Sequence, residues 1–166
     1  TEGTADAPLS VWALPLAAVV AVALIGAVAG VLTREPGRAA LLLGIGGGLL
    51  FGVAVAFTKY VTDLVESDLL GALTAWQTYA LIAAGLSGFY LQQRAFQAGP
   101  LAASLPAVTV CEPLAAVLLG IVVLDERLRL DGARGVIVAS AVIVMIATTV
   151  VLSREQGRVD DAVPAV

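Results

Sequence analysis

Five long apolar runs are the feature that most constrains how this chain can fold. They cover residues 11–32, 39–58, 69–91, 99–124 and 135–152. Each is close to the ~20 residues that a helix needs to cross a bilayer. Inside a bilayer a helix satisfies all of its backbone polar groups within one segment. The sequence therefore predicts an all-α, polytopic integral membrane protein with five transmembrane helices.

The composition agrees with this class and excludes several kinds of chemistry. Of the 166 residues, 60% are hydrophobic and 13% are charged, against roughly 45–50% and 25% in soluble domains. The chain has no histidine, which excludes His-based triads and histidine-ligated zinc hydrolases. Cys111 is the single cysteine, so an intrachain disulfide is impossible. We expect a protein that is not an enzyme, with no cofactor and no nucleic-acid partner.

The two ends of the chain are polar. Residues 1–10 form an N-terminal flank that starts with Thr1 and lacks the basic region of a signal peptide, so we expect the chain to be part of a longer protein. Residues 153–166 form a charged tail with Arg154 and Arg158 near the last run. Five spans place the ends on opposite sides. The positive-inside rule then favours a cytoplasmic tail and an N-terminal end outside the cell membrane.

The second run carries three glycines at spacings of four, Gly44, Gly48 and Gly52. This spacing places them along one helix face, which a neighbouring helix can approach closely. Two interpretations remain open: static packing of small residues, or a sliding contact in a transporter.

The fourth run holds a carboxylate, Glu112, near its middle, where an ionisable group is costly unless it meets a partner, water or an ion. Pro106 and Pro113 each release a backbone carbonyl four residues earlier, and Thr109 precedes Glu112 by one turn. These oxygens suit a proton or a hard cation. The alternative is a protonated Glu112 that donates one hydrogen bond to a neighbouring helix.

Polar side chains also interrupt the second and third runs. Trp76, Gln77 and Tyr79 lie within the third run, where we expect them to face protein or a cavity, although Gln77 also suits an interhelical hydrogen bond. Lys59 follows the second run and is expected to end its helix. It lies beside the substrate path or extends to the membrane surface.

Three segments together resemble a known family. They are FGVAVAFTKY, which contains Lys59, then WQTYALIAAGLSGFYLQQRAFQAGPLAASLPAV, then EPLAAVLLGIVVLDERL. The chain is similar to the C-terminal half of the drug/metabolite transporter superfamily, the EamA-like carriers, and in particular to a bacterial branch related to NIPA-type magnesium transporters. Pro113 matches the family pattern, whereas Glu112 is a feature of this chain.

The resemblance implies a carrier made of two inverted repeats. Residues 39–152 would form one four-helix repeat, and residues 11–32 would be the helix that connects it to a missing N-terminal repeat. The implied function is alternating-access transport of small metabolites or drugs, with magnesium or another divalent cation as the alternative substrate. The expected partners are the lipid bilayer, the substrate, and the other repeat or a dimer partner. A non-transporting membrane scaffold is the alternative from another class.

Overall fold

The computed structural model describes residues 9–123 together with Ser140 and Val151. Within these residues every element is a helix: α1 (Leu9–Leu32), α2 (Pro36–Ser67), α3 (Leu69–Thr74), α4 (Trp76–Ala98) and α5 (Leu101–Val123). Three of them contain stretches long and apolar enough to cross a membrane, at Ala13–Leu32, Pro36–Ser67 and Leu101–Gly120. The all-α prediction is confirmed for the described part of the chain. The predicted fifth run, 135–152, lies outside it apart from those two single residues.

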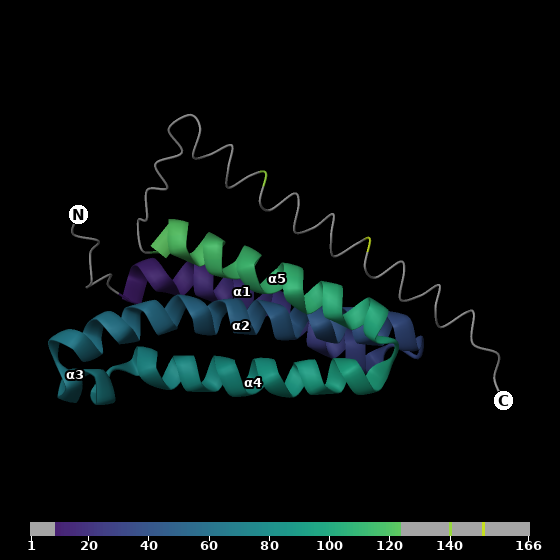
Figure 1. Cartoon of the computed structure of the whole chain (residues 1–166), viewed down its shortest axis with the longest axis horizontal. Helices are drawn as coiled ribbons and strands as arrows, with labels where there is room; N and C mark the ends of the chain where they lie inside the picture. The colour runs from purple at the N-terminus through teal and green to yellow at the C-terminus, as the bar shows by residue number, and fades with distance from the viewer. Residues whose placement is uncertain (1–8, 124–139, 141–150, 152–166) are drawn as a thin grey trace.

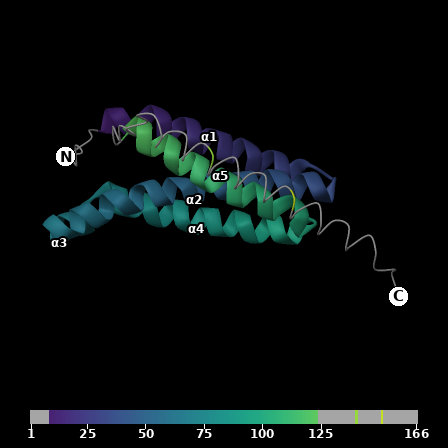
Figure 2. The ribbon, with the colours of Figure 1, turned by 45° about the horizontal axis from the view of Figure 1, so that its top comes forward.

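Helix α2 is the centre of the bundle. It packs along α1, α4 and α5, whereas those three helices have little contact with one another. Both views show α4 on one side of α2 and α1 with α5 on the other (Figures 1 and 2). The apolar core is centred on Phe57, Val53 and Leu119, and it also includes small residues of α4 and α5.

At the turn between α1 and α2, the conformational preferences of Pro36 and of the residue before it determine where the helices end. Pro36 occupies the first turn of α2, where its missing N–H is not needed. The residue before a proline disfavours helical backbone, and Glu35 is extended. The chain therefore breaks between Leu32 and Pro36. Gly99 lies directly against the carbonyl oxygen of Pro36, which brings the α4–α5 turn to the same end of the bundle as the α1–α2 turn.

At the other end, α2 continues beyond the apolar part of its sequence. The second run was expected to end at residue 58 with Lys59 after it, but α2 extends to Ser67. The segment after Lys59 is amphipathic, and a helix need not stop where its side chains become polar. Figure 1 shows this end of α2, with α3, beyond the N-terminal end of α4.

The third predicted run, 69–91, is not one helix in the structure. It is divided at Ala75, which has extended backbone, into the short α3 and the longer α4. Asp68 begins α3 by accepting a hydrogen bond from the backbone N–H of Leu70 at 3.1 Å, as an N-cap residue does. Helix α4 ends at Ala98, seven residues later than the predicted run, and it is not among the stretches apolar enough to span a membrane.

Candidate functional site

The contact between α2 and α5 is built on the three glycines spaced by four. Gly44, Gly48 and Gly52 all face α5, and a Cβ added at any of them would collide with a backbone oxygen of that helix. The oxygens are those of Ser104 at 2.9 Å for Gly44, Val108 at 2.7 Å for Gly48, and Glu112 at a still closer approach for Gly52. Backbone therefore packs on backbone along this contact, with no side chain of α2 between the helices at these positions.

Glycines of α2 also lie at its contacts with α1 and α4. Gly46 packs against the backbone of Ala23 in α1, where an added Cβ would lie 2.9 Å from the carbonyl oxygen. Gly47 packs against Gly88 of α4, with 3.2 Å between an added Cβ and the Gly88 oxygen. Small residues that let helices approach closely are typical of packing inside membranes. Helix α2 thus presents bare backbone to each of its three long neighbours.

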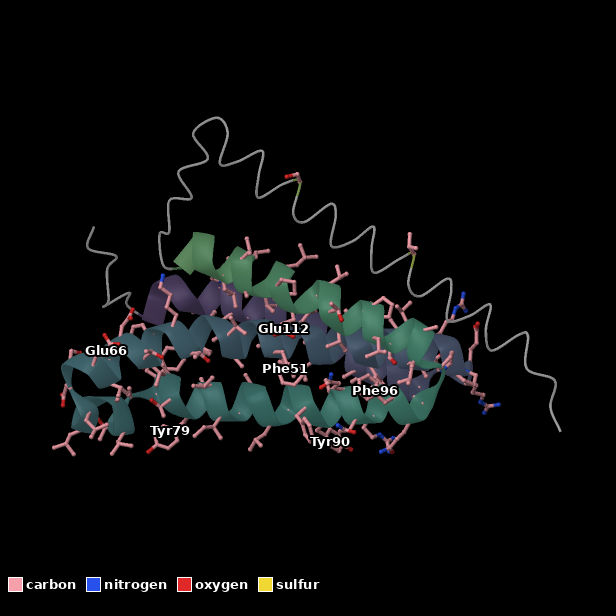
Figure 3. The ribbon with its side chains drawn as sticks, in the orientation of Figure 1. Phe51, Glu66, Tyr79, Tyr90, Phe96 and Glu112 are labelled. Atoms are coloured by element: carbon pink, nitrogen blue, oxygen red, sulfur yellow. The ribbon has the colours of Figure 1, made fainter. Side chains whose placement is uncertain are left out.

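Glu112 lies on α5 at the level of Gly52. Its backbone oxygen faces α2, and the residue as a whole is half-buried. Figure 3 labels Glu112 on α5. Glu112 belongs to the Leu101–Gly120 stretch, which is apolar enough to span a membrane. A carboxyl group is therefore present within a stretch apolar enough to span a membrane, at the edge of a helix–helix contact.

The residues that were expected to place oxygen atoms near Glu112 differ in their exposure and in their hydrogen bonds. The hydroxyl of Thr109 is exposed and donates to the carbonyl oxygen of Leu105 at 2.8 Å, within its own helix. Pro106 and Pro113 lie inside α5 and are half-buried. The structure thus directs the Thr109 hydroxyl toward its own backbone rather than toward Glu112. No group of three potential metal ligands among His, Cys, Asp and Glu occurs in the described residues.

Trp76, Gln77 and Tyr79 lie at the start of α4 rather than in the middle of a span. Trp76 packs edge-on against Phe57 of α2, with 5.5 Å between ring centroids. Gln77 is buried. Tyr79 points outward from α4 in Figure 3, is largely exposed, and donates its hydroxyl to the carbonyl oxygen of Leu73 at 3.0 Å.

Thr78 is a residue whose role the sequence analysis missed. Its hydroxyl donates to the carbonyl oxygen of Ala72 at 2.6 Å. The last carbonyls of a helix have no partner within it, so Thr78 and Tyr79 together satisfy the end of α3. A run of polar residues directly after a short apolar stretch was the available signal for a helix break here.

Ser104 is a second residue that was missed. It is fully buried beside Gly44, and its hydroxyl has no hydrogen-bond partner within the described part of the chain. Its position, eight residues before Glu112 and four before Val108, places it on the α5 face that meets the glycines. That spacing was visible in the sequence.

Among the described residues, arginines gather at one end of the bundle and most of the acidic side chains at the other. Arg34, Arg38 and Arg94 lie near the α1–α2 and α4–α5 turns, where Arg38 pairs with Glu35 at 3.2 Å on the surface. Lys59 is exposed within α2, and beyond it the opposite end of the bundle carries three acidic residues, Asp63, Glu66 and Asp68. Exposed single pairs such as Arg38–Glu35 contribute little to stability.

Comparison with known proteins gives one informative match. No family model matches the chain, and no solved structure matches it. Over 116 residues the chain is 40% identical to an uncharacterised protein of Corynebacterium glutamicum. The matched segment is 69% of this chain and 40% of that relative, so the match covers less than half the length of the relative.

Proposed function

We propose that this chain forms part of a secondary transporter that moves small metabolites or drugs across the cytoplasmic membrane by alternating access. The observation that carries the proposal is Glu112, a half-buried carboxyl group within a membrane-spanning stretch, at the contact between α5 and Gly52 of α2. Ionisable residues at such depth typically mark ion or substrate pathways. Glu112 is the proposed coupling or substrate-binding group.

The glycine contacts of α2 support movement between helices. At its glycines α2 contributes no side chain to this contact, and α5 contributes only the small side chains of Ala107, Cys111 and Ala115. One helix can therefore shift along the other without large side chains having to pass each other. In alternating access, bundles of helices rock around a central site. We therefore assign the α2–α5 contact, with its glycines Gly44, Gly48 and Gly52, as a surface that moves during transport.

The length of the Corynebacterium relative supports a second half. That protein is more than twice as long as the matched segment. In the proposal, α1 connects to an N-terminal repeat and the rest of the chain forms a C-terminal repeat, with the substrate between them. A second copy of the chain is the other arrangement that would complete such a site.

The first test measures water access, because it needs no known substrate. In a Cys111→Ala background, single cysteines replace Glu112, Gln77 and the lipid-exposed Leu86, and the full-length protein is treated with a water-soluble thiol reagent in membrane vesicles. We expect labelling at Glu112 and Gln77 and none at Leu86. Absence of labelling at position 112 would support the alternative that the protein is a membrane scaffold without a transport pathway.

The second test measures flux in proteoliposomes of the full-length protein with a pH-sensitive dye inside. The external probes are amines, amino acids and Mg²⁺, the last because a carboxylate suits a hard cation. We expect Glu112→Gln to abolish the pH dependence of flux, since the amide cannot exchange a proton. Glu66→Gln, at the exposed end of α2, is the matched control and should leave flux unchanged. Unaltered flux and pH dependence in Glu112→Gln would remove Glu112 from the mechanism.

A further inference from the structure

Three exposed leucines on α3 form an apolar patch outside the three stretches that are long and apolar enough to cross a membrane. Leu69, Leu70 and Leu73 have exposed fractions of 60%, 75% and 58%. Residues three and four apart are neighbours on a helix surface, so the three side chains form one patch. On another side of α3 the carboxyl group of Asp68 lies against Gly71 and caps the helix.

The position of α3 relative to the membrane follows from α2. The part of α2 between Arg38 and Lys59 is about 31 Å long at ~1.5 Å per residue, which matches a hydrocarbon core of ~30 Å. Trp76 packs on Phe57, just before Lys59 in α2, so α4 begins near the edge of this core. Helix α3 precedes Trp76 and lies beyond that edge, at the level of the lipid headgroups.

The leucine patch is continuous with the outer face of α4. Tyr79, Ile82, Leu86 and Phe89 are exposed along that face, and the hydroxyl of Tyr79 is bonded to Leu73 of α3. Side chains of α3 and α4 project in the same direction along the lower edge of Figure 3. A lipid surface that covers α4 would therefore also reach α3.

We propose that Leu69, Leu70 and Leu73 insert into the boundary between headgroups and acyl chains, so that α3 is an interfacial anchor on the same membrane. Amphipathic helices lie in this layer with their apolar side chains toward the acyl chains. Trp76 and Tyr79 are at the same end of α4, and such aromatic residues are enriched at membrane interfaces. Asp63 and Glu66, near the end of α2 that precedes α3, are exposed. The proposal rests on membrane embedding and does not depend on transport.

The test places a nitroxide spin label at Leu70 in the full-length Cys111→Ala protein, reconstituted in phosphatidylcholine and phosphatidylglycerol vesicles. Collision with oxygen, which concentrates among acyl chains, is compared with collision with a water-soluble nickel chelate. We expect oxygen to dominate at Leu70 and the nickel chelate to dominate at Glu66, the matched control. A label at Leu73 gives an independent reading if Leu70→Cys does not fold.

Two outcomes would overturn the anchor. Dominance of the nickel chelate at both Leu70 and Leu73 would place the leucines in water. Poor collision with both reagents would show that protein covers the patch, which would make α3 an interface with another segment or chain.

Discussion

Gly52 shows how strongly a single residue of α2 is constrained by α5. A Cβ at this position would overlap the carbonyl oxygen of Glu112 and lie 2.5 Å from the Cβ of Ala115. Both obstacles are close to the backbone, so they cannot turn aside as the end of a long side chain can. The missing side chain is what allows Glu112 to lie at the helix contact.

We predict that Gly52→Ala destabilises the protein by about 1–3 kcal/mol, the usual cost of overpacking. Gly85 is the matched control, because it lies within α4 and an added Cβ would meet nothing within 4 Å. Gly85→Ala should be neutral or stabilise by up to about 1 kcal/mol through helix propensity. Unfolding of both variants in mixed micelles measures the difference. Equal stability of the two variants would show that α5 lies farther from α2.

At the scale of the helices, the sequence was most informative where apolar runs end in helix-breaking residues. The expected end of the first run at Leu32 and the expected start of the fourth run at Gly99 agree closely with α1 and α5, because Pro36 and the Gly99–Pro100 pair interrupt helical backbone. The end of α2 was not predictable in this way. The helix continues through the polar residues after Lys59. Hydropathy indicates where a segment can leave the membrane, whereas backbone hydrogen bonding determines where a helix ends.

The break at Ala75 was missed for a related reason. No glycine or proline lies at the division, and the polar residues that follow it, Gln77 and Thr78, were the available sign of a break. What stabilises it is a pair of hydrogen bonds from Thr78 and Tyr79 to the end of α3. Such bonds require the two helices to be placed first, so a pattern of single residues does not reveal them. The spacing of Gly44, Gly48 and Gly52 pointed to close approach, but not to α5 as the neighbour.

We predict that the double variant Thr78→Val, Tyr79→Phe loosens α3, because it removes both donors at a cost of about 1 kcal/mol each. Hydrogen exchange of the α3 backbone amides should become faster, while that of α2 near Gly48 stays unchanged. Tyr90→Phe is the control, since Tyr90 is as exposed on α4 as Tyr79. Unchanged exchange in α3 would mean that contacts with α2 alone hold it.

For the whole molecule, the distribution of charge suggests an orientation in the membrane. Arg34, Arg38 and Arg94 are at one end of the bundle, and Asp63, Glu66 and Asp68 are at the other. Basic residues are retained on the cytoplasmic side. The α1–α2 turn would then be cytoplasmic, and α3 together with the N-terminal end of α1 would lie outside.

We predict that, in the Cys111→Ala background, a membrane-impermeant thiol reagent labels Ser67→Cys on intact cells. Gly37→Cys, near the start of α2 and also clear of other atoms, should react only after the membrane is opened. Both positions are on ends of the same helix, so each serves as the control for the other. The reverse pattern would invert the orientation.

The bare faces of α2 also bear on how the sequence can diverge. A chain whose central helix meets three neighbours through its backbone has few permissible codons there, since even one methyl group intrudes. The outward residues of α1 and α4, by contrast, need only remain apolar. Saturation mutagenesis should therefore show the lowest tolerance to substitution at positions 44–52 and increasing tolerance toward the outer faces of the bundle. The smallest residues of this protein should accordingly be the slowest to diverge.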